Sequence, residues 1–311
     1  MKTYTSSLLA LASTALAQSK GFNYGATNAD GSCRGYNDFV RFFNEAKSLP
    51  GASGSFNAAR LYTSIQCGSQ NDPIEAFRAA IDTDTTILVG LWASAGRAAY
   101  ENELNALIRG ANELGAAFTD RIMGISVGSE DLYRSSPQGV ANNAGLGATG
   151  AEIEGYIGWM RDWVRGTALE TKPIGHVDTW TAWVLPENRG VADTVNWLGH
   201  NSFPYFEATR PNSIDQAREN FYAALGQTES VSGGKPVWVT ETGWPRLGPN
   251  SGAAVASLEN SKRYYDEVGC SLFGTRNTFW YTLKDANVAQ TDLSFAITPL
   301  ENNTPFFDLT C

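Results

Sequence analysis

The chain has 311 residues, 42% of them hydrophobic, and a formal net charge of −9 at neutral pH. This acidic balance argues against nucleic acids and anionic membranes as partners, and it suits neutral ligands such as polysaccharides. Two histidines leave little material for a histidine-rich metal site or a Ser-His-Asp triad.

The N-terminus has the pattern of a secretory signal. Lys2 provides the positive charge, residues 8–12 the apolar core, and Ala15 with Ala17 the cleavage site. We therefore divide the chain into a signal peptide, residues 1–17, and one catalytic domain, residues 18–311. The apolar core is too short to span a bilayer, and no later segment offers ~20 apolar residues. We expect a monomeric protein that is secreted and lies outside the cell or at the cell wall.

Four cysteines, an even number, favour disulfides in an exported protein, and four cysteines allow three connectivities. We favour Cys33–Cys67 and Cys270–Cys311, because each pair closes a local loop within one end of the chain. The spacing fits no zinc motif, so we expect no metal site.

Apolar runs of β type alternate with helical patterns along the mature chain. The predicted strands are 20–24, 58–62, 86–92, 122–127, 173–178, 196–201, 237–241 and 277–282. The predicted helices include 38–48, 101–114, 152–165, 214–225 and 258–268. Eight βα units without a linker predict an α/β fold, a single-domain (β/α)8 TIM barrel.

Two of these strands lead into a glutamate: the strand 237–241 ends at Glu241, and the apolar run that starts at residue 122 ends at Glu130. In a (β/α)8 barrel the C-terminal strand ends face one shared cleft, and catalytic side chains lie there. A retaining glycosidase needs two carboxyl groups ~5–5.5 Å apart, one as acid/base and one as nucleophile. The pair therefore predicts glycoside hydrolysis, although either glutamate alone is more often a surface carboxylate at the start of a loop.

The motifs that surround these residues resemble glycoside hydrolase family 17, in particular its fungal β-1,3-glucanases and glucanosyltransferases. The resemblance covers almost the whole mature chain and is carried by GFNYG at 21–25, ARLY at 59–62, GLW at 90–92, VGSEDLY at 127–133, GHVDTW at 175–180, ETGWP at 241–245 and FWY at 279–281. It implies a (β/α)8 barrel with Glu130 as acid/base and Glu241 as nucleophile, acting on β-1,3-glucan without a cofactor.

Two positions depart from the pattern of the wider family. Ser129 stands where most members have an asparagine that reaches the sugar 2-hydroxyl, so a shorter hydroxyl must act, directly or through water. The tyrosine that orients the nucleophile is replaced by Phe203, and Tyr205 lies two positions later. Because residues two apart share a strand face, Tyr205 is the expected substitute.

Aromatic and polar residues near the predicted strand ends are candidates to bind sugar, because aromatic rings offer flat apolar partners. The candidates are Tyr24, Tyr62, Trp92, Ser129, Asp178, Trp180, Asn201, Tyr205, Trp244 and Trp280. Core packing is the alternative for each aromatic residue, and Asp178 or Asn201 equally suits a helix cap or a turn. For His176 and His200 we favour hydrogen-bonded core positions.

The expected chemistry is double displacement through a glycosyl-enzyme intermediate. Three functions remain open at this point. Water as acceptor makes a hydrolase, a second glucan makes a transglycosylase with the same two glutamates, and loss of chemistry would leave a wall-binding protein. Linkage preference and the number of subsites depend on loops that the sequence does not define.

Overall fold

The computed structural model describes residues 18–286 and 293–311. The eight strands are β1 (Lys20–Tyr24), β2 (Ala58–Leu61), β3 (Thr86–Leu91), β4 (Ile122–Ser129), β5 (Ile174–Thr179), β6 (Trp197–Asn201), β7 (Val237–Thr242) and β8 (Thr278–Trp280). Each pairs in parallel with its neighbours in chain order, and β8 pairs with β1 to close the barrel. All eight predicted strands and the TIM-barrel prediction are confirmed.

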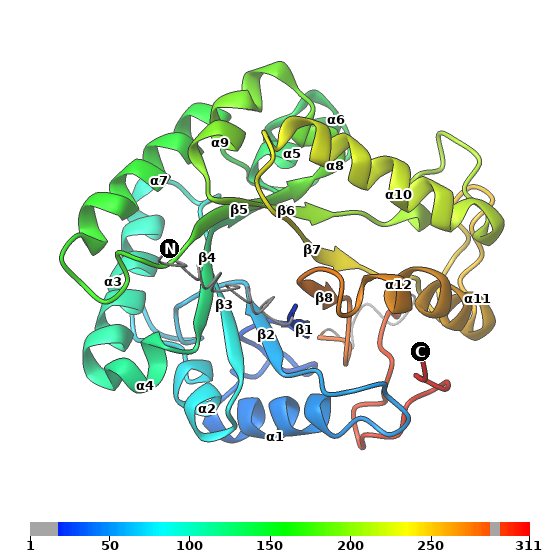
Figure 1. Ribbon diagram of the computed structural model, residues 1–311, viewed down its shortest axis with the longest axis horizontal. Coiled ribbons are helices and arrows are strands. Elements are labelled where there is room, and N and C mark those ends of the chain that lie inside the picture. The colour runs from blue at the N-terminus through cyan, green and yellow to red at the C-terminus, as the bar shows by residue number, and fades with distance from the viewer. Residues whose placement is uncertain (1–17, 287–292) are drawn as a thin grey trace, which may run out of the picture.

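Helices surround this barrel, as Figure 1 shows. The larger ones are α1 (Tyr36–Lys47), α2 (Ala76–Asp82), α3 (Arg97–Leu114), α7 (Gly150–Val164), α10 (Ile214–Val231) and α11 (Leu258–Tyr264). The shorter ones are α4 (Ala116–Thr119), α5 (Asp131–Ser135), α6 (Pro137–Ala141), α8 (Trp180–Trp183), α9 (Arg189–Thr194) and α12 (Cys270–Leu272). In α1, Phe39, Phe42, Phe43 and Ala46 are buried, which is the three- and four-residue spacing that places one helix face on the barrel.

Two predicted helices need correction, and one helix was not predicted. The helix predicted at 258–268 ends at Tyr264 and continues as a π-helical turn, Tyr265–Gly269. The helix predicted to end at residue 225 extends to Val231. The alanine-rich α2 was not predicted, because it has only seven residues and too few turns to show a helical period.

Large side chains fill the lower part of the barrel interior. Trp197 and Trp238 stack with their ring centroids 4.1 Å apart. Gly175 makes room for them, since a Cβ atom there would lie 2.2 Å from the Trp197 ring. Val177 and Phe279 complete this layer. Side chains therefore fill this part of the barrel interior, and only the C-terminal ends of the strands are available for chemistry.

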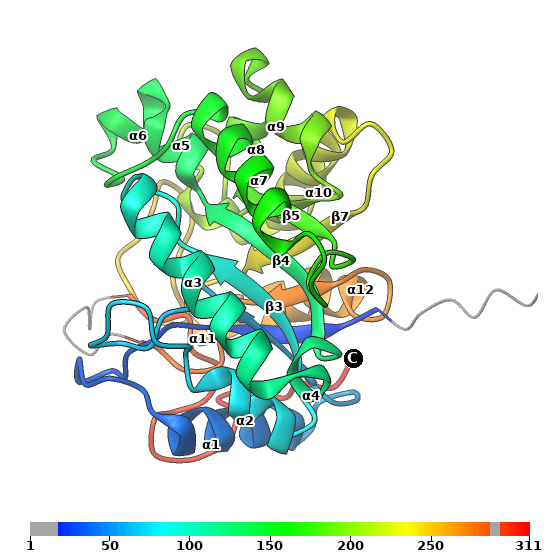
Figure 2. The same cartoon turned by 90° about the vertical axis from the view of Figure 1, so that its left-hand side faces the viewer.

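Two disulfides join segments on the periphery of the barrel. Cys33 bonds to Cys67, and Cys270 bonds to Cys311, so the predicted connectivity is confirmed. In Figure 2 the strand arrows point toward the end of the barrel that carries α5 and α6, and the C-terminus lies at the other end. Residues 1–17, the predicted signal peptide, lie outside the described residues. In the described ranges, every helix is too short or too polar to cross a bilayer.

Candidate active site

The two predicted catalytic glutamates lie at the C-terminal ends of β4 and β7. Glu130 follows the last residue of β4, and Glu241 is the penultimate residue of β7. The side chain of Glu241 is 11% exposed, and the side chain of Glu130 is 24% exposed. Each glutamate has its own arginine and its own uncharged donor, but the arginine lies 2.6 Å from Glu241 and 3.6 Å from Glu130.

Glu241 accepts hydrogen bonds from Arg60 of β2 and from Tyr62, the residue that follows β2. The Arg60 guanidinium donates to Glu241 Oε1 at 2.6 Å, and the Tyr62 hydroxyl donates to the same oxygen at 2.9 Å. Burial, the charge of Glu241 and the hydrogen bond to it raise the pKa of Tyr62, so the phenol remains a donor. Acceptance of two donors by one oxygen is the pattern expected of an ionised carboxylate.

Arg60 is a buried cation that connects both halves of the site. Its side chain is 1% exposed, and burial at this depth requires compensating partners. Besides Glu241, it donates to Asn23 Oδ1 at 2.8 Å and to the Ser129 hydroxyl at 2.8 Å. One planar guanidinium therefore fixes the nucleophile candidate and the residue that precedes the acid/base candidate.

Glu130 has different surroundings. Its backbone adopts a left-handed conformation with φ of 59°, which turns the chain sharply from β4 into α5. Asn201 Nδ2 donates to Oε1 at 3.0 Å, and Arg134 lies 3.6 Å from Oε2. The amide of Asn201 is oriented in turn by the Thr240 hydroxyl, which donates to its Oδ1 at 2.8 Å.

The electrostatics of Glu130 favour its protonated form. Burial in the site and the negative charge of Glu241 raise its pKa to about 7, and the charge of Asp178 adds to this effect. Asn201 and Arg134 act in the opposite direction but do not offset it. A carboxyl group with a pKa near 7 can both hold a proton and release it at neutral pH, as an acid/base must.

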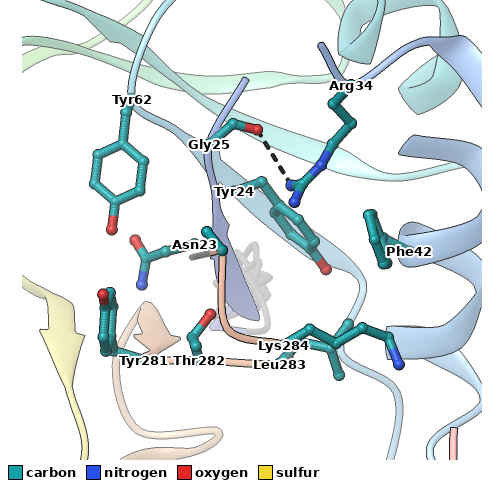
Figure 3. A pocket seen from close by; sticks show the side chains of 11 residues that line it. Asn23, Tyr24, Gly25, Arg34, Phe42, Tyr62, Tyr281, Thr282, Leu283 and Lys284 are labelled. Carbon is teal, nitrogen blue, oxygen red and sulfur yellow. Dashed lines mark hydrogen bonds between the residues drawn. The ribbon is translucent and has the colours of Figure 1, made fainter. Parts of the chain in front are cut away.

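A cavity of about 220 Å³ adjoins the Glu241 side of the site. Figure 3 shows Tyr62, Asn23 and Tyr281 gathered at one side of this cavity and Tyr24 with Phe42 at the other. Tyr281 is close enough to both glutamates for their charges to raise its pKa, after the larger effect of burial. The cavity therefore opens beside the carboxylate pair.

Several predicted sugar-binding residues gather around the carboxylates. Tyr62, Ser129 and Asn201 contact Glu241, Arg60 and Glu130 respectively. Trp92 is 45% exposed at the end of β3, where its ring is available to a ligand. Trp180 is half-buried and donates to Glu207. Tyr24 turns toward Phe43 of α1, with ring centroids 5.1 Å apart, but still borders the cavity.

Asp178 and Trp280 lie on the outer face of their strands, where the structure places them against helices. Asp178 is fully buried and accepts from the backbone N–H groups of Leu132 and Tyr133 at the start of α5. Trp280 packs on Tyr265, with ring centroids 5.2 Å apart. Residues at alternate positions point into the barrel, so these two have the wrong register for a cleft. Asp178 therefore caps a helix, and Trp280 is a core residue.

Tyr205 and Trp244 are also core residues. Tyr205 belongs to a 3₁₀ turn, Pro204–Phe206, so its relation to Phe203 is not that of two strand residues. Its hydroxyl donates to the Pro249 carbonyl, and Tyr62 donates to Glu241 instead. Trp244 is 1% exposed and donates to the Val255 carbonyl. His176 and His200 are fully buried, as predicted.

Sequence reasoning missed Arg60, Asn23 and Tyr281 as site residues. Arg60 had a detectable signal, since an arginine within an apolar strand of a barrel must have a buried partner. Asn23 and Tyr281 had no such signal, because asparagine and tyrosine are common at strand ends. Within the described residues, no group of three or more His, Cys, Asp or Glu is arranged to hold a metal ion.

A closed parallel barrel with glutamates at the C-terminal ends of β4 and β7 is the architecture of a barrel glycoside hydrolase. Residues 21–295 match the model of the BtgE/BtgC glycoside hydrolase domain, and the chain belongs to this family. The resemblance to glycoside hydrolase family 17 is likewise confirmed.

Two curated relatives and one solved structure illustrate the relationship. The probable glucan endo-1,3-beta-glucosidase eglC of Aspergillus oryzae is 48% identical over 96% of this chain and 64% of its own length. Its counterpart from Aspergillus fumigatus is 49% identical over 97% of this chain and 67% of its own length. The chain thus spans about two thirds of these relatives. The glycoside hydrolase family 17 beta-1,3-glucanosyltransferase of Rhizomucor miehei is 25% identical, with a TM-score of 0.71, over 94% of this chain and 97% of its own.

Proposed function

We propose that this protein cleaves β-1,3-glucan by double displacement, with Glu241 as nucleophile and Glu130 as acid/base. The observation that carries the proposal is the contrast between the two glutamates. Glu241 accepts from Arg60 and Tyr62, whereas the pKa of Glu130 is raised to about 7 by burial and by the charge of Glu241. The substrate class follows from the glucan endo-1,3-beta-glucosidases to which the chain is similar.

In the first step Glu241 attacks the anomeric carbon, and the bond from that carbon to the leaving oxygen breaks. Glu130 donates its proton to this oxygen, so the leaving sugar departs as a neutral alcohol. Arg60 and Tyr62 hold the attacking carboxylate in place, and both donate to the same oxygen, Oε1. The other oxygen, Oε2, is then the one that attacks.

The second step uses the change of charge that the first produces. Esterified Glu241 is neutral, and its charge no longer raises the pKa of Glu130. Glu130, which gave up its proton in the first step, therefore stays ionised and takes a proton from the incoming water as base. The water oxygen bonds to the anomeric carbon, the ester bond breaks, and Glu241 returns as a carboxylate.

Transfer to a second glucan is the alternative outcome of the same mechanism. It is favoured by one observation, the similarity to the glucanosyltransferase of Rhizomucor miehei across almost the whole chain. The acceptor alone distinguishes the two reactions, since Glu130 deprotonates either water or a sugar hydroxyl. A wall-binding protein without chemistry is disfavoured by the complete set of partners around both carboxylates.

The test is incubation of the purified protein with a ladder of reduced β-1,3-gluco-oligosaccharides, with products sized by mass spectrometry. Glu241→Gln is the control, because it keeps the shape of the site and removes the nucleophile. Shorter products alone establish hydrolysis, and products longer than the input establish transfer. Identical traces from wild type and control would refute the enzymatic proposal. As part of this proposal, the protein is secreted and acts in the turnover of cell-wall glucan.

A further inference from the structure

A buried cluster of charged residues lies beneath the acid/base candidate, on the outer face of the barrel. It contains His176 and Asp178 of β5 and Asp131 at the start of α5, all with exposed fractions of 0%. The mechanism above does not use any of them. Burial of three ionisable groups together is costly unless their charges and hydrogen bonds compensate.

The hydrogen-bond geometry defines the charge state of His176. Its Nδ1 lies 2.6 Å from the Val127 carbonyl oxygen, which can only accept. Its Nε2 lies 3.0 Å from Asp178 Oδ2. Asp178 already accepts from three backbone N–H groups, those of Leu132, Tyr133 and Thr179, as an ionised carboxylate does. Both ring nitrogens of His176 therefore have to donate, and only the imidazolium form does so.

This cluster fixes the turn that carries Glu130. The register between β4 and β5 shifts after Ser126, so the strand bulges just before the glutamate. Three consecutive residues of β5 hold the bulge and the turn. His176 binds the Val127 carbonyl, the Val177 carbonyl accepts from the Glu130 N–H at 2.8 Å, and Asp178 caps α5.

We propose that His176 is a buried imidazolium cation that positions the Glu130 turn and balances the negative charge beneath it. The proposal rests on the proposed acid/base role of Glu130. Burial alone would lower the pKa of His176, but the hydrogen bond and charge of Asp178 and the charge of Asp131 outweigh it and raise the pKa. Trp183 of α8 packs against the cluster with an uncharged ring, 5.5 Å from the imidazole between centroids, and the positive charge of Arg134 also acts on Asp131.

His200 provides a matched control within the same chain. It lies on the adjacent strand, in register with Asp178, and is equally buried. Its Nδ1 bonds to the Thr228 hydroxyl at 2.9 Å, and burial lowers its pKa to about 3. His200 is therefore neutral at the pH where His176 is cationic.

The first measurement is ¹⁵N NMR of wild-type protein labelled at histidine, which has only these two histidines. At about pH 7 we expect one imidazole with both nitrogens protonated and one neutral imidazole. A spectrum with two neutral imidazoles would overturn the proposal. This result depends neither on folding of a variant nor on any enzymatic activity, so it remains decisive if the proposed function fails.

The second measurement is the pH dependence of kcat/KM for His176→Gln and His200→Gln. Without the imidazolium, the charge of Asp178 acts unopposed on Glu130 and raises its pKa. The basic limb of the profile, where Glu130 loses its proton, then shifts upward by about half a unit or more in His176→Gln. His200→Gln removes a neutral group and leaves the limb in place. Equal shifts in both variants would contradict the proposal.

Discussion

The two sides of the candidate active site each carry a glutamate, but the electrostatic surroundings of the two side chains are opposite. On the β7 side, a buried arginine and a phenol donate to Glu241. On the β4 side, Glu130 has one amide donor and a more distant arginine, and it lies close to the charges of Glu241 and Asp178. Under the proposed mechanism, the partners of each glutamate, and not its residue type, decide which one attacks and which one transfers a proton.

Replacement of Arg60, the cation beside Glu241, is expected to have the largest effect on the difference between the two glutamates. Arg60→Gln leaves Glu241 buried without its charged partner, and the loss of one member of a buried pair costs about 3–5 kcal/mol. We expect kcat/KM on a β-1,3-glucan to fall on the order of 10³-fold. Arg60→Lys keeps the charge but not the fork that reaches Ser129, so an intermediate value is expected. Full activity in Arg60→Gln would show that the ion pair does not support the nucleophile.

The tyrosine on the same side contributes a smaller effect. Tyr62→Phe keeps the ring over which the Arg60 guanidinium lies, 4.8 Å from the centroid, and removes only the hydroxyl. A hydrogen bond to a charged group contributes about 1.5–3 kcal/mol, so kcat should fall roughly 10- to 100-fold. Tyr205→Phe is the matched control, because its hydroxyl contacts the Pro249 carbonyl and not Glu241. Equal losses in the two variants would contradict the assignment.

The barrel and the positions of its two glutamates were predictable from the sequence, but most residues that bond to the glutamates were not. Strand periodicity and the two terminal glutamates placed Glu130 and Glu241 at one end of one barrel. The direction of a side chain depends on register, and β4 contains a bulge that local pattern does not reveal. Asp178 of β5 and Trp280 of β8 face the helices and not the cleft, because the sequence of a strand buried on both faces does not show which face points into the barrel. Arg60 was overlooked because its partner, Glu241, lies 181 positions away.

The Glu130 side predicts a pH effect rather than a large loss of rate. Because the pKa of Glu130 is about 7, the basic limb of kcat/KM should lie near that pH in the wild type. Asn201 lowers this pKa through its hydrogen bond, so Asn201→Ala should move the limb upward by about half a unit. Thr240→Val, which removes the hydroxyl that orients the Asn201 amide, should produce a smaller shift in the same direction. A downward shift in Asn201→Ala would contradict the role given to Asn201.

Glu103 sharpens the comparison, because its pKa is also raised to about 7 by burial although it lies outside the cleft. It accepts from the Thr63 hydroxyl and the Ser64 N–H, and so supports the loop that follows Tyr62. Its folded pKa lies above its unfolded value of 4.5. The stability that it contributes is therefore fully present below about pH 4.5 and is lost as the pH rises through about 7.

We accordingly expect Tm to fall between about pH 4.5 and 7, and to fall less in Glu103→Gln, which cannot ionise. Up to about 3 kcal/mol of pH-dependent stability is involved, or several degrees in Tm for a chain of this size. Calorimetry at several pH values, with Glu101→Gln on the same helix as an exposed control, measures the difference. The basic limb of the rate profile should stay in place in Glu103→Gln, because Glu130 sets it. A limb that moved with Glu103 would show that the raised pKa responsible for catalysis lies in α3 and not at the end of β4.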